Sequence, residues 1–365
     1  MMQISPETQL FIREHSSDDV RVLALQAKKY PDIDMPTAIT QIAGRKVAAE
    51  KIPSWWEIEK IWYPKHLSLE QCSSEITARY KARLLQGDSL TDLTGGFGID
   101  CSFLATGFKS ATYVERQEEL CEIAAHNFPV LNLNHINIKN EDGVTYLQAM
   151  SPVDCLFLDP ARRNEHGGKT VAISDCEPNV AELEELLLQK ANRVMIKLSP
   201  MLDLSLALKE LKQTQEVHIL SVNNECKELL ILLGQTSPAE ISIHCVNLFT
   251  KGTQKEQHFV FTREQEQCSE CTYTDSLETY LYEPNASLLK AGAFRSIAAA
   301  YPVRKLHPNS HLYTSDTFIE NFPGRIFRIV NQCSFNKKEV KENLADLKKA
   351  NVTVRNFPEI GRASC

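Results

Sequence analysis

The chain has 365 residues, of which 43% are hydrophobic and 24% charged, a composition typical of a globular protein rather than a disordered one. Its formal net charge of −7 argues against a protein coated for non-specific binding to nucleic acid. No stretch approaches the roughly 20 apolar residues that a membrane-spanning helix needs, and the N-terminus lacks the layout of a signal peptide, so we expect a cytoplasmic protein without a membrane partner.

The charge is distributed unevenly along the chain. Residues 281–365 contain 13 Lys and Arg against 7 Asp and Glu, a net of +6, which leaves −13 for residues 1–280. An acidic body with a mildly basic C-terminal region is typical of an enzyme with a module for an anionic substrate, although an ordinary solvated surface has the same pattern. Among the 11 cysteines, Cys268 and Cys271 have metal-like spacing but no second pair nearby, so we predict no metal site.

Residues 1–86 are predicted to form a helical domain. Apolar residues recur at helical spacing over 18–30, which Pro31 closes, and again over 35–55 and 67–87. In the last of these segments, a helix over 71–81 places Lys81 on one face with Thr77, where it either covers the cofactor pocket or packs against the sheet.

Residues 87–235 alternate short apolar strands with helices, which predicts a doubly wound parallel α/β sheet. The predicted strands span 89–94, 110–115, 136–142, 153–160, 193–200, 216–222 and 228–234. The last two are separated by a segment too short for a parallel crossover, so they should pair antiparallel. Seven strands with a closing hairpin favour a Rossmann-like methyltransferase sheet over a dinucleotide-binding one. Residues 236–280 are expected to be an irregular or strand-rich connector, and residues 281–365 a smaller α+β region.

The stretch DLTGGFG, residues 92–98, joins the first predicted strand to a helix. Its glycines allow a tight turn and a close approach of the backbone to a ligand at the carboxyl ends of the strands. Cys101 stands where the dinucleotide fingerprint needs a small residue, and Asp100 would repel a pyrophosphate at the helix start. S-adenosylmethionine has no phosphate and bears an ammonium and a sulfonium, so Asp92 favours this methyl donor over a dinucleotide.

Acidic residues also end the second and third predicted strands. Glu115 can accept hydrogen bonds from both ribose hydroxyls of an adenosine, whether of the methyl donor or of NAD. Asp142, in preference to Glu141, is predicted to accept a hydrogen bond from the adenine amino group. The predicted cofactor-binding residues are therefore Asp92, Thr94, Gly95, Gly96, Phe97, Gly98, Glu115, Arg116, Glu141, Asp142, Gly143 and Lys81.

The fourth predicted strand ends in LDPARR, residues 158–163, where a methyltransferase faces its acceptor. Asp159 can position an acceptor nitrogen or orient the methionine end of the donor, and Arg162 can clamp a phosphate or stack on a base. We predict Asp159, Pro160 and Arg162 as catalytic residues, and Arg163, Lys197 and Ser199 as substrate-binding residues. Ordinary strand-end polarity explains Lys197 and Ser199 equally well.

Several stretches resemble bacterial class I S-adenosylmethionine-dependent methyltransferases with a THUMP-like C-terminal domain. They are DLTGGFG (92–98), YVER (113–116), LDPARR (158–163), IKLSP (196–200), QCSSEITARYK (71–81), YEPNASLLKAGAF (282–294) and HPNSHLYT (307–314). The resemblance implies methyl transfer from S-adenosylmethionine (EC 2.1.1.-), a ferredoxin-like piece over 281–320, and an incomplete THUMP-like piece over 321–365. Because THUMP modules are similar to RNA-binding ones, it also implies RNA, either tRNA or rRNA, as the acceptor.

The chain departs from related patterns at Ala161 and Arg162, where amino-group methyltransferases have a proline and an aromatic residue that stacks on the base. C5-uracil methyltransferases have a related Asp-Pro-Pro-Arg but need a cysteine nucleophile, and Cys226 lies one strand too late for that role. We therefore predict direct transfer to an RNA base. Methylation of a small molecule or protein, and donor binding without turnover, remain alternatives.

Overall fold

The structure is a computed structural model that describes residues 4–162, 172–236, 238–334, 336–345, 349 and 351. The chain divides into two compact units, Met1–Val217 with Glu228–Ala239, and His218–Lys227 with Glu240–Cys365. The first unit contains the helical region and most of the sheet, including every described residue of the predicted site. In the parts of the chain that the structure describes, no helix has both the length and the apolar character needed to cross a bilayer.

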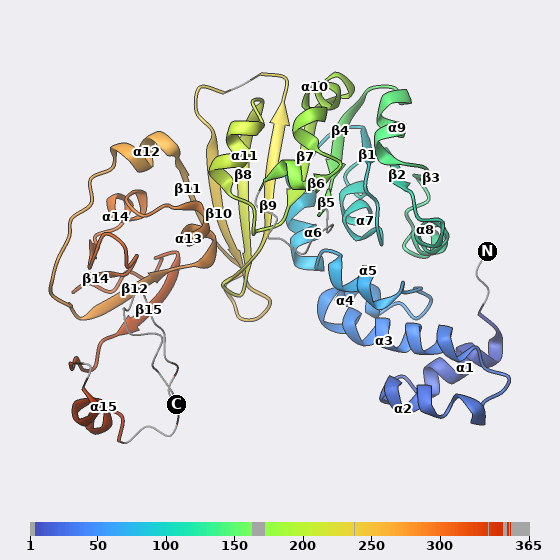
Figure 1. Cartoon of the computed structure of the whole chain (residues 1–365), viewed down its shortest axis with the longest axis horizontal. Helices are drawn as coiled ribbons and strands as arrows, with labels where there is room; N and C mark the ends of the chain where they lie inside the picture. Colours follow the sequence, from blue (N-terminus) through green and yellow to red (C-terminus); the bar gives the residue numbers. More distant parts are fainter. Residues whose placement is uncertain are drawn as a thin grey trace. The chain divides into compact units, whose positions relative to one another are not determined.

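The N-terminal region is helical, as predicted. Its helices are α1 (Pro6–Glu14), α2 (Val20–Leu25), α3 (Met35–Lys51), α4 (Pro53–Trp56), α5 (His66–Gln71) and α6 (Glu75–Ala82). Asp34 caps α3 by accepting a hydrogen bond from the backbone N–H of Thr37 at 3.2 Å. Buried side chains of α1, α2 and α3, among them Phe11, Leu23 and Ile42, pack into one small core, and these helices lie side by side (Figure 1).

The central sheet has nine strands in the order β11-β10-β8-β9-β7-β4-β1-β2-β3. Its strands are β1 (Ser89–Asp92), β2 (Ser110–Glu115), β3 (Ile136–Asn140), β4 (Val153–Leu158), β7 (Ala191–Leu198), β8 (Thr214–Val222), β9 (Glu225–Gly234), β10 (Ser242–Leu248) and β11 (Glu256–Thr262). The pairs β1–β2, β2–β3, β1–β4 and β4–β7 are parallel, and β9 runs antiparallel to β7. The α/β fold class and the seven predicted strands are confirmed.

The sheet is larger than predicted because the expected connector contributes two strands. Residues 236–280 include β10 and β11, which pair antiparallel, followed by α12 (Arg263–Cys268). Ile243, Cys245 and Phe261 are buried at 1%, 0% and 2% exposure, so this segment has its own apolar face. Adding strands beyond β8 also pairs an edge that would otherwise be exposed, which explains why the region forms regular structure.

Helices cover the sheet of the first unit, and strands and helices alternate along the chain as the periodicity predicted (Figure 1). They are α7 (Ile99–Ala105), α8 (Glu118–Val130), α9 (Gly143–Ala149), α10 (Val180–Lys190) and α11 (Leu204–Glu210). A two-stranded ribbon of β5 (Ala161–Arg162) and β6 (Cys176–Glu177) follows the end of β4. It starts at the predicted catalytic stretch.

The second unit contains a separate four-stranded sheet with the order β13-β14-β12-β15. Its elements are β12 (Tyr280–Pro284), α13 (Ala286–Ala291), α14 (Ser296–Ala300), β13 (Arg304–Lys305), β14 (Tyr313–Ser315), β15 (Gly324–Arg328) and α15 (Lys337–Asn343). Tyr282, Tyr313 and Phe322 are almost fully buried and form its aromatic core. Most of the predicted THUMP-like piece beyond residue 345 lies outside the described residues.

Candidate active site

The glycine turn after β1 is held against both neighbouring strands. The Leu93 N–H donates to the Phe157 carbonyl at 3.0 Å, and the Gly95 N–H donates to the Val114 carbonyl at 2.8 Å. A side chain at Gly95 would place its Cβ 2.2 Å from the Tyr113 ring, and Gly98 has a φ of +86°, in the left-handed region. These positions therefore require glycine, and the turn exposes backbone instead of side chains at the ends of the strands.

Asp92, at the end of β1, is a buried carboxylate with one unsatisfied oxygen. Its exposure is 1%, and Oδ1 accepts a hydrogen bond from the Thr94 N–H at 3.0 Å. Oδ2 has no hydrogen-bond partner among the described residues. Burial raises the pKa of Asp92 well above its ordinary value, against the hydrogen bond from Thr94, and the nearby Asp100, Asp159 and Glu115 raise it further.

Glu115, at the end of β2, fastens the glycine turn. Its Oε2 accepts from the Gly96 N–H at 2.9 Å, and its Oε1 accepts from the Gln117 N–H at 2.8 Å. Each oxygen retains a second lone pair, so the carboxylate can still accept from a ligand hydroxyl. The neighbouring Arg116 points to a different partner, because its Nη1 lies 3.3 Å from Glu177 Oε1 in an exposed ion pair.

The end of β3 serves a structural purpose in the described chain. Asp142 is exposed and caps α9, since its Oδ1 accepts from the N–H groups of Val144 and Thr145 at 3.0 Å each. The Glu141 N–H donates to the Glu115 carbonyl at 3.1 Å. A Cβ at Gly143 would lie 2.2 Å from the Leu93 carbonyl oxygen, so this glycine permits close contact between the β1 and β3 ends.

Asp159 follows β4 and pairs with a lysine from the next strand. Its Oδ2 accepts a hydrogen bond from Lys197 Nζ, and its N–H donates to Thr94 Oγ1 at 2.6 Å. The Asp159 side chain is 37% exposed, whereas that of Lys197 is 10% exposed. Burial alone would lower the pKa of Lys197, but the charges of Asp159, Asp100 and Glu228 outweigh it and raise the pKa, so this lysine is an ammonium and not a base.

A buried network of charges extends from this pair to α6. The fully buried Lys81 directs its ammonium to Ser73 Oγ at 3.0 Å, Asp100 Oδ1 at 3.0 Å and Glu228 Oε2 at 2.5 Å. Lys197 Nζ lies 3.7 Å from Asp100 Oδ2. Burial would raise the pKa of Asp100, but Lys81 and Lys197 outweigh that effect and lower the pKa. The network thus links α6, α7, β7 and β9.

The described site is acidic overall. Asp100, Asp159 and Glu228 pair with the two lysines, Lys81 and Lys197, and two further acids, Asp92 and Glu115, contact the backbone of the glycine turn and of the segment after β2. The acidic side chains therefore outnumber the lysines by five to two. A cationic ligand fits this environment better than a pyrophosphate does.

The remaining predicted site residues have different surroundings. Pro160 is buried, and Ser199 Oγ accepts from the Met201 N–H at 3.3 Å. Phe97 is 4% exposed and packs edge-on against Trp55 with ring centroids 5.2 Å apart, which places it in the apolar core beside the helical region. Arg162 ends β5, and Arg163 lies outside the described residues.

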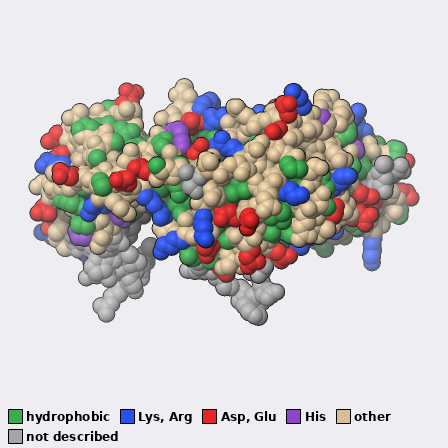
Figure 2. Space-filling model, turned by 90° about the horizontal axis from the view of Figure 1, so that it is seen from above, with side chains coloured by type: hydrophobic (Ala, Val, Ile, Leu, Met, Phe, Trp, Pro, Cys, Tyr) green, Lys and Arg blue, Asp and Glu red, His purple; other side chains and the backbone are tan. Residues whose placement is uncertain are grey.

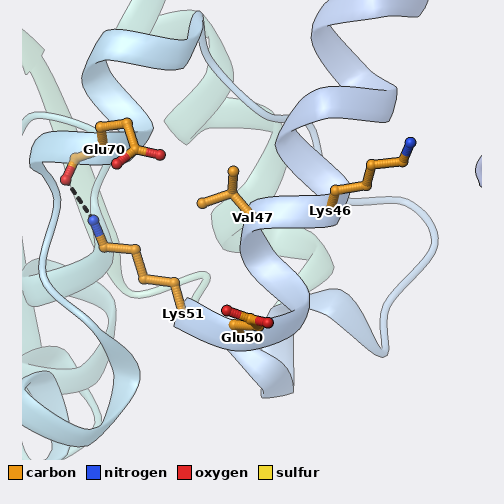
Figure 3. Close-up of a pocket in the computed structure, with 5 residues that line it drawn as sticks. All are labelled: Lys46, Val47, Glu50, Lys51 and Glu70. Carbon is orange, nitrogen blue, oxygen red and sulfur yellow. Dashed lines mark hydrogen bonds between the residues drawn. The ribbon is translucent and has the colours of Figure 1, made fainter. Parts of the chain in front are cut away.

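A shallow hollow of about 500 Å³ lies elsewhere in the first unit, between α3 and α5. Lys46, Val47, Glu50, Lys51 and Glu70 line it (Figure 3). Lys51 reaches across it and donates to the Glu70 carbonyl at 2.6 Å, while Lys46 points away. None of the predicted site residues that the structure describes lines this hollow.

Among solved structures, the chain is similar to that of a putative methyltransferase from Porphyromonas gingivalis W83. The two are 34% identical with a TM-score of 0.84, and the match covers 98% of this chain and 90% of the other. The chain belongs to the family of this protein. Its C-terminal region fits the expected resemblance, because residues 280–323 match a ferredoxin-like domain family and residues 324–359 match a THUMP domain-like family.

Two structures of lower sequence identity each match less than half of this chain. An rRNA methylase from Streptococcus thermophilus is 14% identical over 44% of this chain and 93% of its own, with a TM-score of 0.32. SMU.1697c, a putative methyltransferase from Streptococcus mutans crystallised with SAH, is also 14% identical, over 44% of this chain and 96% of its own, with the same TM-score of 0.32. No curated protein sequence matches the chain.

Glu228 and Ser73 belong to the buried charge network, although the sequence predicted neither of them as a site residue. The sequence places Glu228 at the start of an apolar strand, yet its side chain is buried, with 5% exposure, and contacts Lys81, which is 147 positions away. A charged residue at the start of the run ELLILLG was the available signal, because such a residue is rarely buried without a partner. Nothing in the local sequence indicates that the partner is on α6.

Proposed function

We propose that the chain is an S-adenosylmethionine-dependent methyltransferase that transfers a methyl group directly to a base of RNA. The observation that carries the proposal is Asp92, whose buried Oδ2 lacks a partner among the described residues beside a glycine turn. An unsatisfied buried carboxylate is costly, and a ligand ammonium would satisfy it. Membership in the family of a putative methyltransferase supports the same reaction.

The residues at the strand ends fit the parts of this cofactor. Asp92 would accept hydrogen bonds from the ammonium, and the backbone of Thr94, Gly95, Gly96 and Gly98 would lie against the methionine moiety. Glu115 would accept from the ribose hydroxyls, with Arg116 beside it, and Glu141, Asp142 and Gly143 would border the adenine. Lys81 and Phe97 would shape the pocket from α6 and the turn. When bound, the cofactor supplies an electrophilic methyl group.

The residues after β4 and β7 would orient the acceptor. Lys197 donates a hydrogen bond to one oxygen of Asp159. The other carboxylate oxygen would accept a hydrogen bond from an N–H group of the methyl acceptor, which would align the lone pair of that nitrogen for in-line transfer. Pro160 restricts the backbone that follows. Arg162, Arg163 and Ser199 would contact substrate phosphate or base at the same edge. Catalysis would then depend mainly on positioning, since the raised pKa of Lys197 excludes it as a base.

RNA is the proposed acceptor because of the C-terminal region. Residues 324–359 match a THUMP domain-like family, and residues 281–365 carry the excess of basic residues. On the face that Figure 2 shows, basic and acidic side chains are intermingled, so that face offers no continuous basic surface. Recognition would therefore reside in a dedicated module and not in a generally cationic body. We place this reaction in the cytoplasm.

Two measurements test the proposal. Isothermal titration should detect S-adenosylmethionine binding, and its absence up to millimolar concentration contradicts the cofactor assignment. Mass spectrometry of nucleosides from cells with and without the gene should reveal one methylated nucleoside that disappears with the gene. If the cofactor binds but tritiated methyl groups enter neither RNA, protein nor small molecules, the chain binds the donor without turnover, which the departure at Ala161 and Arg162 would then explain.

A further inference from the structure

Five side chains of the first unit form a row of alternating charge. In order they are Glu228, Lys81, Asp100, Lys197 and Asp159, so that each ammonium lies between two carboxylates. The first four residues are at most 9% exposed, whereas the Asp159 side chain is 37% exposed. Of the five, it is therefore mainly Asp159 that reaches solvent, and this is the residue proposed to face the methyl acceptor.

Lys197 lies between two carboxylates and is closer to one of them. Its Nζ donates a hydrogen bond to Asp159 Oδ2, whereas it lies 3.7 Å from Asp100 Oδ2, which is beyond hydrogen-bond distance. Both carboxylates attract the ammonium, and a lysine side chain is flexible enough to turn from one to the other. The position of the Asp100 carboxylate therefore determines which acid Lys197 binds.

Ser73, which lies just before α6, holds the Asp100 carboxylate. Its hydroxyl donates to Asp100 Oδ2 at 2.7 Å, and this is the same oxygen that faces Lys197. The Ser73 hydroxyl also accepts from Lys81 Nζ at 3.0 Å, and Lys81 Nζ lies 3.0 Å from Asp100 Oδ1. Both oxygens of Asp100 are thus engaged from the side of α6. Because Ser73 is only 3% exposed, water would not readily take the place of its hydroxyl.

We propose that Ser73 is a positioning residue, which directs the Lys197 ammonium to Asp159 and so keeps this carboxylate oriented toward the methyl acceptor. The inference rests on the proposed function, because it requires an acceptor at this end of the row. Without the Ser73 hydroxyl, Asp100 Oδ2 would lack its hydrogen-bond donor and would draw the ammonium of Lys197 toward itself. A purely structural network would tolerate this exchange, since every charge would remain beside an opposite charge.

Ser73→Ala tests the proposal, because it removes one hydroxyl and leaves all charges of the row in place. The measurement is transfer of tritiated methyl groups from S-adenosylmethionine to RNA of cells that lack the gene, with both substrates in excess. The rate should fall by about tenfold or more, since a small displacement of a positioned group has effects of this size. Binding of S-adenosylmethionine in isothermal titration should be unchanged, because Asp92 and Glu115 keep their contacts.

Ser102→Ala is the matched control. Ser102 is also 3% exposed, and its hydroxyl donates to the Ile99 carbonyl at 2.8 Å, outside the row of charges. This variant should lose a similar amount of stability and keep the wild-type rate of methyl transfer. An equal loss of rate in both serine variants would show a general effect of removing a buried hydroxyl and would overturn the inference.

A second substitution distinguishes positioning from a structural role. Asp100→Asn replaces the competing carboxylate by a neutral amide, so adding it to Ser73→Ala should restore most of the rate. A structural role predicts a further loss, because the double variant also removes one counter-ion of the buried Lys81. A double variant that is folded by circular dichroism but no faster than Ser73→Ala would contradict the proposal. If the double variant does not fold, the two serine variants decide.

The same assays separate failure of this inference from failure of the proposed function. A full rate of transfer in Ser73→Ala, or a loss of S-adenosylmethionine affinity as large as the loss of rate, would overturn the inference alone. A wild-type chain that binds no S-adenosylmethionine, or binds it and transfers no methyl group, would overturn the proposed function and this inference together.

Discussion

Two acidic residues that follow strands of the same sheet, Asp92 at the end of β1 and Asp142 just after β3, have different surroundings. Asp92 is 1% exposed and keeps an oxygen without a hydrogen-bond partner among the described residues. Asp142 is exposed, and its carboxylate accepts from two N–H groups at the start of α9. In sequence the two look alike. The comparison teaches that a buried acid with an unpartnered oxygen is a candidate for ligand binding, whereas an exposed acid can be satisfied by capping a helix.

The variant with the largest expected effect is Lys81→Met, which tests the buried network of charges. It leaves Asp100 and Glu228 buried without their main cation, so we expect the free energy of unfolding to fall by about 3–5 kcal/mol. Urea denaturation measures the change. Lys109→Met removes a lysine whose pair with Asp88 is 79% and 70% exposed, and it should have no measurable effect. Equal losses of unfolding free energy in the two variants would contradict a large contribution of the buried network to stability.

Asp92→Asn should weaken S-adenosylmethionine binding by about tenfold or more, as expected for loss of a charge-assisted hydrogen bond. The same change should stabilise the free protein at neutral pH. The pKa of Asp92 is raised in the folded chain, so the unfolded chain releases this proton first, from about pH 4 upward. The wild type therefore loses stability relative to the variant as the pH rises toward the pKa of the folded chain. Titration calorimetry and denaturation at several pH values measure both effects.

Asp154→Asn provides the matched control with the opposite sign. Hydrogen bonds from Ser89 Oγ and from the N–H groups of Asp88 and Ser89 lower the pKa of Asp154. Its ionised form therefore stabilises the protein above the unfolded pKa, and that contribution is lost as pH falls through the folded value. The variant should be less stable than wild type at neutral pH and should bind the cofactor normally. A stability gain here would refute the contrast.

Gly143→Ala tests the close contact between Gly143, the residue after Asp142, and the backbone of Leu93. Its Cβ would lie 2.2 Å from the Leu93 carbonyl oxygen, so overpacking should lower the free energy of unfolding by about 1–3 kcal/mol. Gly107→Ala meets its nearest atom at 3.8 Å and should be nearly neutral. Thermal denaturation of both variants measures the difference, and a neutral Gly143→Ala would mean that the β1 and β3 ends separate easily.

The smallest expected effect is that of Asp142→Ala, about 1 kcal/mol of stability from the lost helix cap. Asp142→Ser keeps a capping oxygen and should restore most of it. The pair also tests the proposed adenine contact, because cofactor affinity should fall in both variants if the carboxylate binds the ligand. If cofactor affinity instead falls in Asp142→Ala and recovers in Asp142→Ser, as stability does, Asp142 acts only as a helix cap.

The sequence by itself determined the class of fold and the position of the turn. Strand and helix periods, together with the glycines at 95, 96 and 98, depend on local backbone preferences and need no tertiary information. The sequence allows strands in residues 236–280 but does not show that β10 and β11 extend the central sheet, since this depends on pairing with a sheet edge more than on local pattern.

Tertiary structure alone decided which acids remain unsatisfied and which charges pair. Lys81 and Glu228 are 147 positions apart, and Lys197 and Asp159 are 38 apart, so only the packing of α6, β4, β7 and β9 brings them together. Contacts between distant segments depend on how whole elements pack, and an amino-acid pattern read along one segment contains no record of its partner.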